Sequence, residues 1–283
     1  MSRRSRTLAA GLLVGALSLG LAGCGSGSGS AAGQGCTPAH QFPTISGGTL
    51  TVGVYDLPPF ISTQGEGGLS GIDADIVKAV AAAECLEVKA NNAGAAAMVP
   101  GVQNGRLDVV VGDWYRTQER AAVVNFTDPI YLDDMGLVSA DGVATVDGLQ
   151  QRTVGTVDGY LWVDDLKKML GDSLKLYPSG TDMQADLKAG RIQAGVDSFG
   201  SAVNTVGSDP AFKVVKAQPD PRVRASEQPA QSGFMLPKDN QAMLDAFNAD
   251  LAKLRADGTI AKILTDHGLE ASAAEVGTPR LIG

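Results

Sequence analysis

At residues 109–120 the chain reads VVVGDWYRTQER. The apolar run from Leu107 to Val111 predicts a buried strand that ends at Gly112, where charged and aromatic side chains begin. The residues after Thr117 have the composition of a helix. In open α/β sheets, ligands bind at the carboxyl ends of the strands, where helices leave the sheet. We therefore expect Arg120 to bind a carboxylate at this edge.

The composition is that of a globular α/β protein. Of the 283 residues, 44% are hydrophobic, which is enough for a sizeable core. The net charge of −8 argues against nucleic acid as a partner, because phosphate binding needs a basic surface. No C-x-x-C pair, P-loop or H-E-x-x-H motif occurs, and the two histidines, His40 and His267, stand alone. We therefore expect neither a metal nor a cofactor.

Residues 1–23 have the pattern of a bacterial lipoprotein signal peptide. Three arginines precede an apolar stretch that is too short and too rich in glycine to span a membrane. The following Leu21-Ala22-Gly23-Cys24 resembles a lipobox, in which the cysteine thiol is lipidated. A plain secretory signal peptide is the alternative. With a lipid on Cys24, residues 24–47, rich in Gly and Ser at their start, would form a flexible tether outside the membrane.

Two further cysteines, Cys36 and Cys85, would reach an oxidising compartment on export. A disulfide between them would pin the tether to the folded domain. Two unpaired thiols are the equal alternative, because sequence does not set the separation of the Cα atoms.

Strand and helix patterns alternate twice along the chain, which predicts two α/β lobes joined by two crossings with a cleft between them. We expect the first lobe to comprise residues 48–137 and 231–283, and the second to comprise residues 138–230. The expected strands lie at residues 50–54, 86–90, 107–111, 153–157, 174–177, 192–196, 212–215 and 233–236. The main expected helices begin near residues 71, 95, 121, 162, 180, 201, 241 and 259.

Short motifs in this order resemble the family 3 extracellular solute-binding proteins, which capture polar amino acids for ABC importers. The motifs extend over nearly all of residues 48–267, and their order and spacing carry the resemblance. They include Pro58-Pro59-Phe60, Gly71-Ile72-Asp73-Ala74-Asp75, Asn104-Gly105-Arg106-Leu107-Asp108, Thr117-Gln118-Glu119-Arg120, Phe126-Thr127-Asp128-Pro129, Ala189-Gly190-Arg191 and Ala256-Asp257-Gly258-Thr259.

The resemblance implies a two-lobe periplasmic-binding-protein-like fold of type II, which closes on its ligand about a hinge. It also implies a monomer that docks on a membrane permease, and a role for Arg120 in pairing with the ligand's α-carboxylate. A guanidinium fork matches a carboxylate with two parallel hydrogen bonds. The protein would work outside the cytoplasm, anchored by lipid to the bacterial cell membrane.

The chain departs from the family pattern at the pocket wall. Leu57 and Ala95 stand where the family often has large side chains. Aromatic residues gather instead at two strand ends, where they would form a wall suited to a cationic or amphipathic ligand through cation–π contact. Core or hinge packing is the alternative. The expected wall consists of Trp114, Tyr115, Tyr160 and Trp162, with backbone N–H groups near Leu161 as further donors.

The sequence does not decide which residue would pair with the amine of the ligand. Ser198 occupies the position where the family usually has an aspartate, and Asp197 precedes it. Asp197 or Asp113 is a candidate, and Asp56 suits a distal positive group on the ligand. A ligand without an ordinary α-amine is the remaining possibility.

The leading prediction is therefore a non-enzymatic solute-binding lipoprotein that captures an amino acid or a related carboxylate. The alternative is an enzyme on the same fold, resembling the cyclohexadienyl dehydratases. It would need a general acid in the cleft, for which Asp113 and Asp197 are candidates. The identity of the ligand, the identity of the permease, and a role in transport or in signalling stay open.

Overall fold

The computed structural model describes residues 35–65 and 68–283. The predicted signal peptide, Cys24 and the first part of the predicted tether lie outside these residues. Within them, no helix is both long and apolar enough to cross a membrane.

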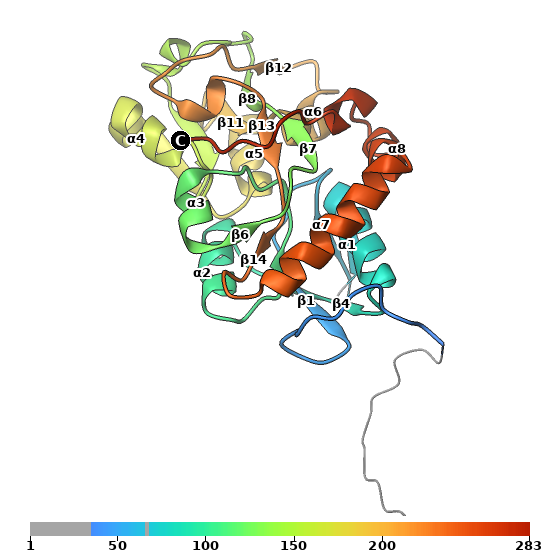
Figure 1. The fold of residues 1–283 in the computed structure, drawn as a ribbon. Helices are drawn as coiled ribbons and strands as arrows, with labels where there is room; N and C mark the ends of the chain where they lie inside the picture. The colour runs from blue at the N-terminus through green and yellow to red at the C-terminus, as the bar shows by residue number, and fades with distance from the viewer. Residues whose placement is uncertain (1–34, 66–67) are drawn as a thin grey trace, which may run out of the picture. The chain divides into compact units, whose positions relative to one another are not determined.

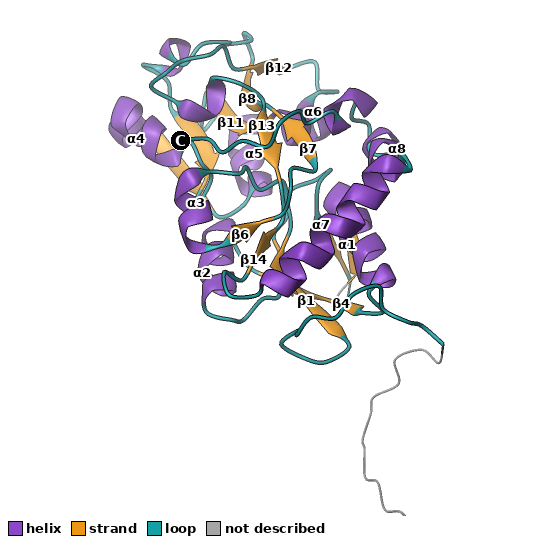
Figure 2. Cartoon of the chain, viewed as in Figure 1, coloured by secondary structure: helices purple, strands orange, loops and turns teal. Residues whose placement is uncertain are grey.

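The first sheet has five strands in the order β4-β1-β5-β14-β6. β1 (Thr49–Val54) runs parallel to β4 (Glu87–Asn92) and to β5 (Val109–Val110), while β14 (Met235–Leu236) runs antiparallel to β5 and β6 (Asn125–Phe126). In Figures 1 and 2 its helices lie on two flanks. One flank carries α1 (Ile72–Ala83), α7 (Gln241–Ala256) and α8 (Thr259–Asp266), and the other carries α2 (Met98–Gln103) and α3 (Gln118–Val123).

The second sheet has the order β10-β9-β11-β8-β12. β9 (Val154–Val157) is parallel to β10 (Leu174–Tyr177) and β11 (Ala194–Ser198), and β8 (Met135–Ser139) is antiparallel to β11 and β12 (Lys213–Lys216). Its helices are α4 (Val163–Leu170), α5 (Gly180–Lys188) and α6 (Phe199–Val206). The inner strands β9, β11 and β8 are buried along their whole length, as expected for strands covered by helices.

The chain crosses between the sheets on two short strands that pair with each other. β7 (Tyr131–Asp133) and β13 (Ala230–Ser232) form an antiparallel ladder of three residue pairs. A second small ladder joins β2 (Ser62–Gln64) to β3 (Gly68–Ser70). Short 3₁₀ turns occupy Ala95–Ala97, Asp147–Leu149, Gly171–Ser173, Arg224–Ser226 and Ala271–Ala274.

The sheet to which each strand belongs defines where one lobe ends and the other begins. β8 lies wholly in the second sheet, so the boundary expected at residues 137/138 falls inside this strand. We therefore propose that the second lobe begins at Met135. The segment before Gly283 contacts both parts of the chain, because Ile282 N donates to Arg116 O at 2.9 Å and Arg224 Nη1 donates to Gly283 O at 2.8 Å.

Cys36 and Cys85 are joined by a disulfide, with their Cα atoms 5.9 Å apart. Cys85 lies just after α1, so the bond ties the segment before β1 to the end of that helix. Of the two states that the sequence allows, the structure has the bonded one.

Candidate functional site

The carboxyl ends of strands from both sheets meet at one small cavity. Its volume is about 30 Å³, which by a rule of roughly 10–15 Å³ for each water has room for about two waters. Eight of the ten ligand-binding residues expected from sequence line it. The lining residues are Tyr55, Leu57, Asp113, Trp114, Tyr115, Arg120, Tyr160, Leu161, Trp162 and Ser198.

Local helix chemistry explains the spacing of Thr117 and Arg120. Thr117 is the N-cap of α3, and its Oγ1 accepts a hydrogen bond from Arg120 N at 3.1 Å. The cap fixes the first turn of the helix, which holds Arg120 at the cavity. There Arg120 Nη1 donates to Tyr115 O at 3.0 Å, and Nη2 donates to Gly159 O at 3.2 Å. The second bond crosses from the first lobe to the second.

The guanidinium of Arg120 also lies over an aromatic ring. Its Cζ atom is 4.7 Å from the centroid of the Trp114 ring, within the range of a cation–π contact. Burial lowers the pKa of Arg120 to about 10, so the side chain stays a cation at neutral pH. The site therefore offers a fixed positive charge whose two terminal nitrogens each donate to a neutral carbonyl oxygen.

Three of the four expected aromatic residues pack edge to face on one another at the cavity. Tyr115 and Trp162 have ring centroids 6.1 Å apart, and Tyr160 and Trp162 have centroids 5.3 Å apart. Trp114, Tyr115 and Trp162 are also buried in the apolar cores, so they serve both as core packing and as pocket wall. Tyr160 Oη is buried and has no hydrogen-bond partner among the described residues, which leaves it able to donate into the site.

Tyr55 is a lining residue that the sequence interpretation missed. Its ring lies 5.5 Å from Trp114 and 6.4 Å from Tyr160, measured between centroids, and its hydroxyl donates to Gly112 O at 2.6 Å. The available signal was its position directly after β1, at the same sheet edge as Trp114. Leu57, where the family often has a large side chain, lines the same cavity.

The two lobes approach each other closely at small residues. A Cβ atom added to Gly159 would lie 2.8 Å from Ala96 N and 2.9 Å from Ala96 Cα. The backbone at Gly159 also has a positive φ of 86°, which favours glycine. Residues with small side chains, Ala95 and Ala96, lie at this approach, and Ala95 is a position where the family often has a large side chain.

Asp113 lines the cavity, and its carboxylate is held by the crossing strands. It accepts a hydrogen bond from the hydroxyl of Ser232 in β13. Burial and the nearby carboxylate of Asp133 raise the pKa of Asp113. Asp133 in β7 in turn accepts from Tyr115 Oη at 2.6 Å and from Gly200 N at 3.2 Å. Asp113 therefore belongs to an acidic network that joins the cavity to both crossings.

Asp197 and Asp56 do not line the cavity. β11 continues through Ser198, and because successive strand residues point to opposite faces, Ser198 reaches the cavity while Asp197 does not. Asp197 is fully buried; its Oδ1 accepts from Ser198 N at 2.9 Å, and burial raises its pKa to about 7. Asp56 accepts from Thr181 Oγ1 at 3.3 Å, which is a contact between the lobes.

Known proteins with similar sequences are solute-binding proteins. The model of the bacterial extracellular solute-binding proteins, family 3, matches residues 50–270. The chain is 27% identical over 253 residues to the glutamate-binding protein GluB of Corynebacterium glutamicum, covering 83% of this chain and 84% of the relative. It is 26% identical over 216 residues to the histidine-binding periplasmic protein of Escherichia coli, covering 72% of this chain and 81% of the relative.

Solved structures give the same result. An ancestral arginine-binding protein bound to arginine is similar with a TM-score of 0.68 at 26% identity, and the match covers 78% of this chain and 98% of that one. This likeness and the two sheets confirm the predicted two-lobe fold. The relatives named here are amino-acid-binding proteins rather than enzymes, which confirms the predicted non-enzymatic role. The chain belongs to family 3 of the bacterial extracellular solute-binding proteins.

Proposed function

We propose that the chain captures an amino acid, or a related small solute with a carboxylate, outside the cytoplasm and delivers it to the permease of an ABC importer. The observation that carries this proposal is Arg120, a cation at the meeting point of two lobes with its N–H groups directed at carbonyl oxygens. A carboxylate is a stronger acceptor for a guanidinium than a neutral carbonyl. A ligand carboxylate would therefore displace the contact between Arg120 and Gly159.

The size of the cavity supports capture by movement of the lobes. At about 30 Å³ it is too small for any amino acid, because even the smallest has several non-hydrogen atoms. The ligand would enter with the lobes apart and be enclosed as they close. β7 and β13 provide the hinge in this proposal, because they carry the chain between the two sheets. Closure would shield the Arg120–carboxylate pair from water and salt.

The amino-acid class is supported by the relatives, which are named for binding glutamate, histidine and arginine. The cavity offers an ammonium group an aromatic wall and the carboxyl group of Asp113. We propose Asp113, with Ser198 and Tyr160 as hydrogen-bonding neighbours, as the partner of the ligand amine. Asp197 and Asp56 would act indirectly. Asp197 would hold Ser198 by accepting from its backbone N–H, and Asp56 would join the lobes through its contact with Thr181.

A ligand screen tests the function directly. The purified chain is melted in the presence of each of the twenty amino acids, betaines and opines, since a ligand that binds only the folded state raises the Tm. For the best ligand, calorimetry on Arg120→Ala should show a loss of about 2–5 kcal/mol, or roughly 30-fold to several thousand-fold in Kd.

The controls separate the carboxylate clamp from general effects. Arg120→Lys keeps the charge without the fork and should recover only part of the affinity. Arg106→Ala removes an exposed arginine of the same lobe and should bind as the unmodified chain does. If Arg120→Ala bound the ligand with unchanged Kd, Arg120 would not be the carboxylate clamp. If no carboxylate solute changed the Tm, the proposed ligand class would be wrong.

The proposed anchor is a lipid on Cys24, which lies outside the described residues. The support is the lipobox-like sequence before it and the Gly/Ser-rich segment after it. Cells expressing the chain and fed an alkyne fatty acid should label it, and Cys24→Ser should abolish the label and release the protein from the membrane fraction. We also propose that the protein docks on the permease as a monomer. Released from the membrane by Cys24→Ser, it should elute as a monomer in size-exclusion chromatography.

A further inference from the structure

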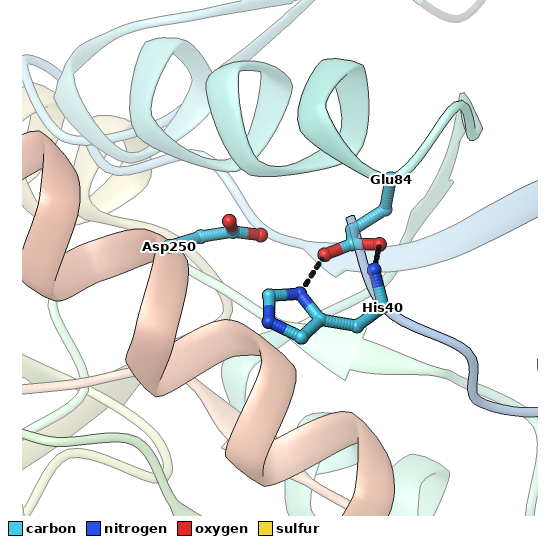
Figure 3. A group of neighbouring side chains, drawn as sticks. All are labelled: His40, Glu84 and Asp250. Atoms are coloured by element: carbon cyan, nitrogen blue, oxygen red, sulfur yellow. Dashed lines mark hydrogen bonds and ion pairs between the residues drawn. The ribbon is translucent and has the colours of Figure 1, made fainter. Parts of the chain in front are cut away.

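Three side chains from distant parts of the sequence converge beside the disulfide, away from the cavity. Figure 3 shows His40 from the segment before β1, Glu84 from the end of α1, and Asp250 from α7. One ligand atom from each of them lies within 4.8 Å of the other two. The sequence interpretation treated His40 as isolated, because its neighbours in space lie far along the chain.

The imidazole and one carboxylate are already in contact. His40 Nδ1 lies 2.5 Å from Glu84 Oε1, and His40 N donates to Glu84 Oε2 at 2.8 Å. Glu84 is buried, with 3% of its surface exposed, whereas the side chain of His40 is 39% exposed. The group therefore has a buried floor and one side that is open to water.

The second carboxylate is unsatisfied. Asp250 is 5% exposed, and its Oδ2 is buried with no hydrogen-bond partner among the described residues. Figure 3 shows this carboxylate directed from α7 toward Glu84 and the imidazole ring. Two buried carboxylates that face each other repel, and leaving either without a partner costs free energy. Beside the His40–Glu84 pair, the group therefore holds a buried carboxylate oxygen that has no partner among the described residues.

We propose that His40, Glu84 and Asp250 form a binding site for a divalent transition-metal cation of the zinc class. An imidazole nitrogen and two carboxylate oxygens are ligands that zinc accepts at about 2.0–2.2 Å, usually in a tetrahedral arrangement. The exposed side of His40 leaves room for a water as the fourth ligand. Calcium and magnesium prefer all-oxygen sites, so the imidazole selects against them.

The position of the site indicates a structural role. The metal would join the segment that carries His40 to two helices of the first lobe, next to the Cys36–Cys85 bond. A backbone bond from Ala39 N to Ala83 O, at 3.1 Å, already brings this segment to the end of α1. The metal would therefore fix the point at which the proposed tether meets the fold.

Zinc titration of the chelator-treated chain tests the proposal. We expect calorimetry to show one equivalent bound, and ZnCl₂ to raise the Tm, while CaCl₂ and MgCl₂ bind far more weakly. His40→Gln and Asp250→Asn should each weaken zinc binding by more than about tenfold, the loss that even an outer-shell partner can cause. Cobalt in place of zinc should give the visible absorption of a tetrahedral site, and Asp250→Asn should lose it.

The other histidine provides a matched control. His267 Nε2 lies 2.8 Å from Asp75 Oδ2, and within residues 35–65 and 68–283 no third metal-binding side chain joins this pair. His267→Gln should therefore bind zinc as the unmodified chain does.

Two results would overturn the proposal. One is zinc binding that is equal in the unmodified chain and in Asp250→Asn. The other is an unmodified chain that binds no zinc. If Asp250→Asn were then also more stable than the unmodified chain, Glu84 and Asp250 would share a proton instead of a metal. Circular dichroism of each variant establishes that it is folded before titration.

Discussion

Replacing Asp197 by Asn should stabilise the fold near neutral pH and much less in mild acid. Asp197 is fully buried in β11, and its Oδ2 has no hydrogen-bond partner among the described residues. Burial raises its pKa from 3.8 to about 7. Asparagine has the same shape, keeps an oxygen to accept from Ser198 N, and carries no charge to desolvate at any pH.

The magnitude follows from linkage between protonation and folding. Between pH 3.8 and about 7 the folded chain holds a proton on Asp197 that the unfolded chain has released. The unfolded state then binds fewer protons, so the free energy of unfolding falls as pH rises, by about 1.36 kcal/mol for each unit. From pH 5 to pH 7, this one group costs the unmodified chain roughly 2.3 kcal/mol, a little less than two full units of slope because the carboxyl group is half ionised at pH 7. Asp197→Asn removes that cost.

Urea unfolding followed by tryptophan fluorescence at pH 5, 6, 7 and 8 measures the effect. The gain in unfolding free energy from Asp197→Asn should grow by about 2–3 kcal/mol between pH 5 and pH 7 and then level off. Asp172→Asn removes an exposed charge on the same lobe and should leave the pH profile unchanged. Parallel profiles for the unmodified chain and Asp197→Asn would refute the reasoning, because the buried carboxylate would then ionise without cost.

Two further predictions concern contacts that fix the lobes and the segment before them. Gly159→Ala and Gly190→Ala both place alanine at a positive φ, but only at Gly159 would the new Cβ meet Ala96, at 2.8 Å. In Gly159→Ala this overpacking should cost the closed state about 1–3 kcal/mol, which raises the Kd of the best ligand roughly 5- to 150-fold in calorimetry. Gly190→Ala is the control, because it should lose stability but keep the Kd of the unmodified chain. The double variant Cys36→Ser, Cys85→Ser removes a bond between residues 49 apart, and its free energy of unfolding in urea should fall by about 4 kcal/mol. A reducing agent should destabilise the unmodified chain by a similar amount and leave the double variant unchanged.

The sequence was most informative where the chemistry is local. Thr117 as N-cap sets the position of Arg120 three residues later, and both belong to one helical turn. A run of apolar residues likewise marks the strand before Asp113, although the paired strand is only Val109–Val110. Such signals depend on neighbours along the chain, so one sequence is enough to recognise them.

The sequence did not predict features that depend on the last residue of a strand or on contacts between distant parts of the chain. The expected strand at residues 192–196 in fact ends at Ser198, and this extension decides that Ser198, and not Asp197, reaches the cavity. Periodicity identifies a strand but does not fix its last residue. The convergence of His40 with Asp250 needs the folded chain, because no pattern along the sequence connects them.

The contacts across the cavity can be replaced by a ligand. Arg120 reaches Gly159 O at 3.2 Å, and Asp56 accepts from Thr181 at 3.3 Å. Each of these contacts has one charged partner, and a hydrogen bond of this kind contributes about 1.5–3 kcal/mol net. A ligand carboxylate paired in fork fashion with Arg120 would replace the single bond to Gly159 O by two parallel charge-assisted bonds, which is the gain that favours the ligand. On the proposed function, the lobes open to admit the ligand, and the ligand's carboxylate then makes the closed state the preferred one.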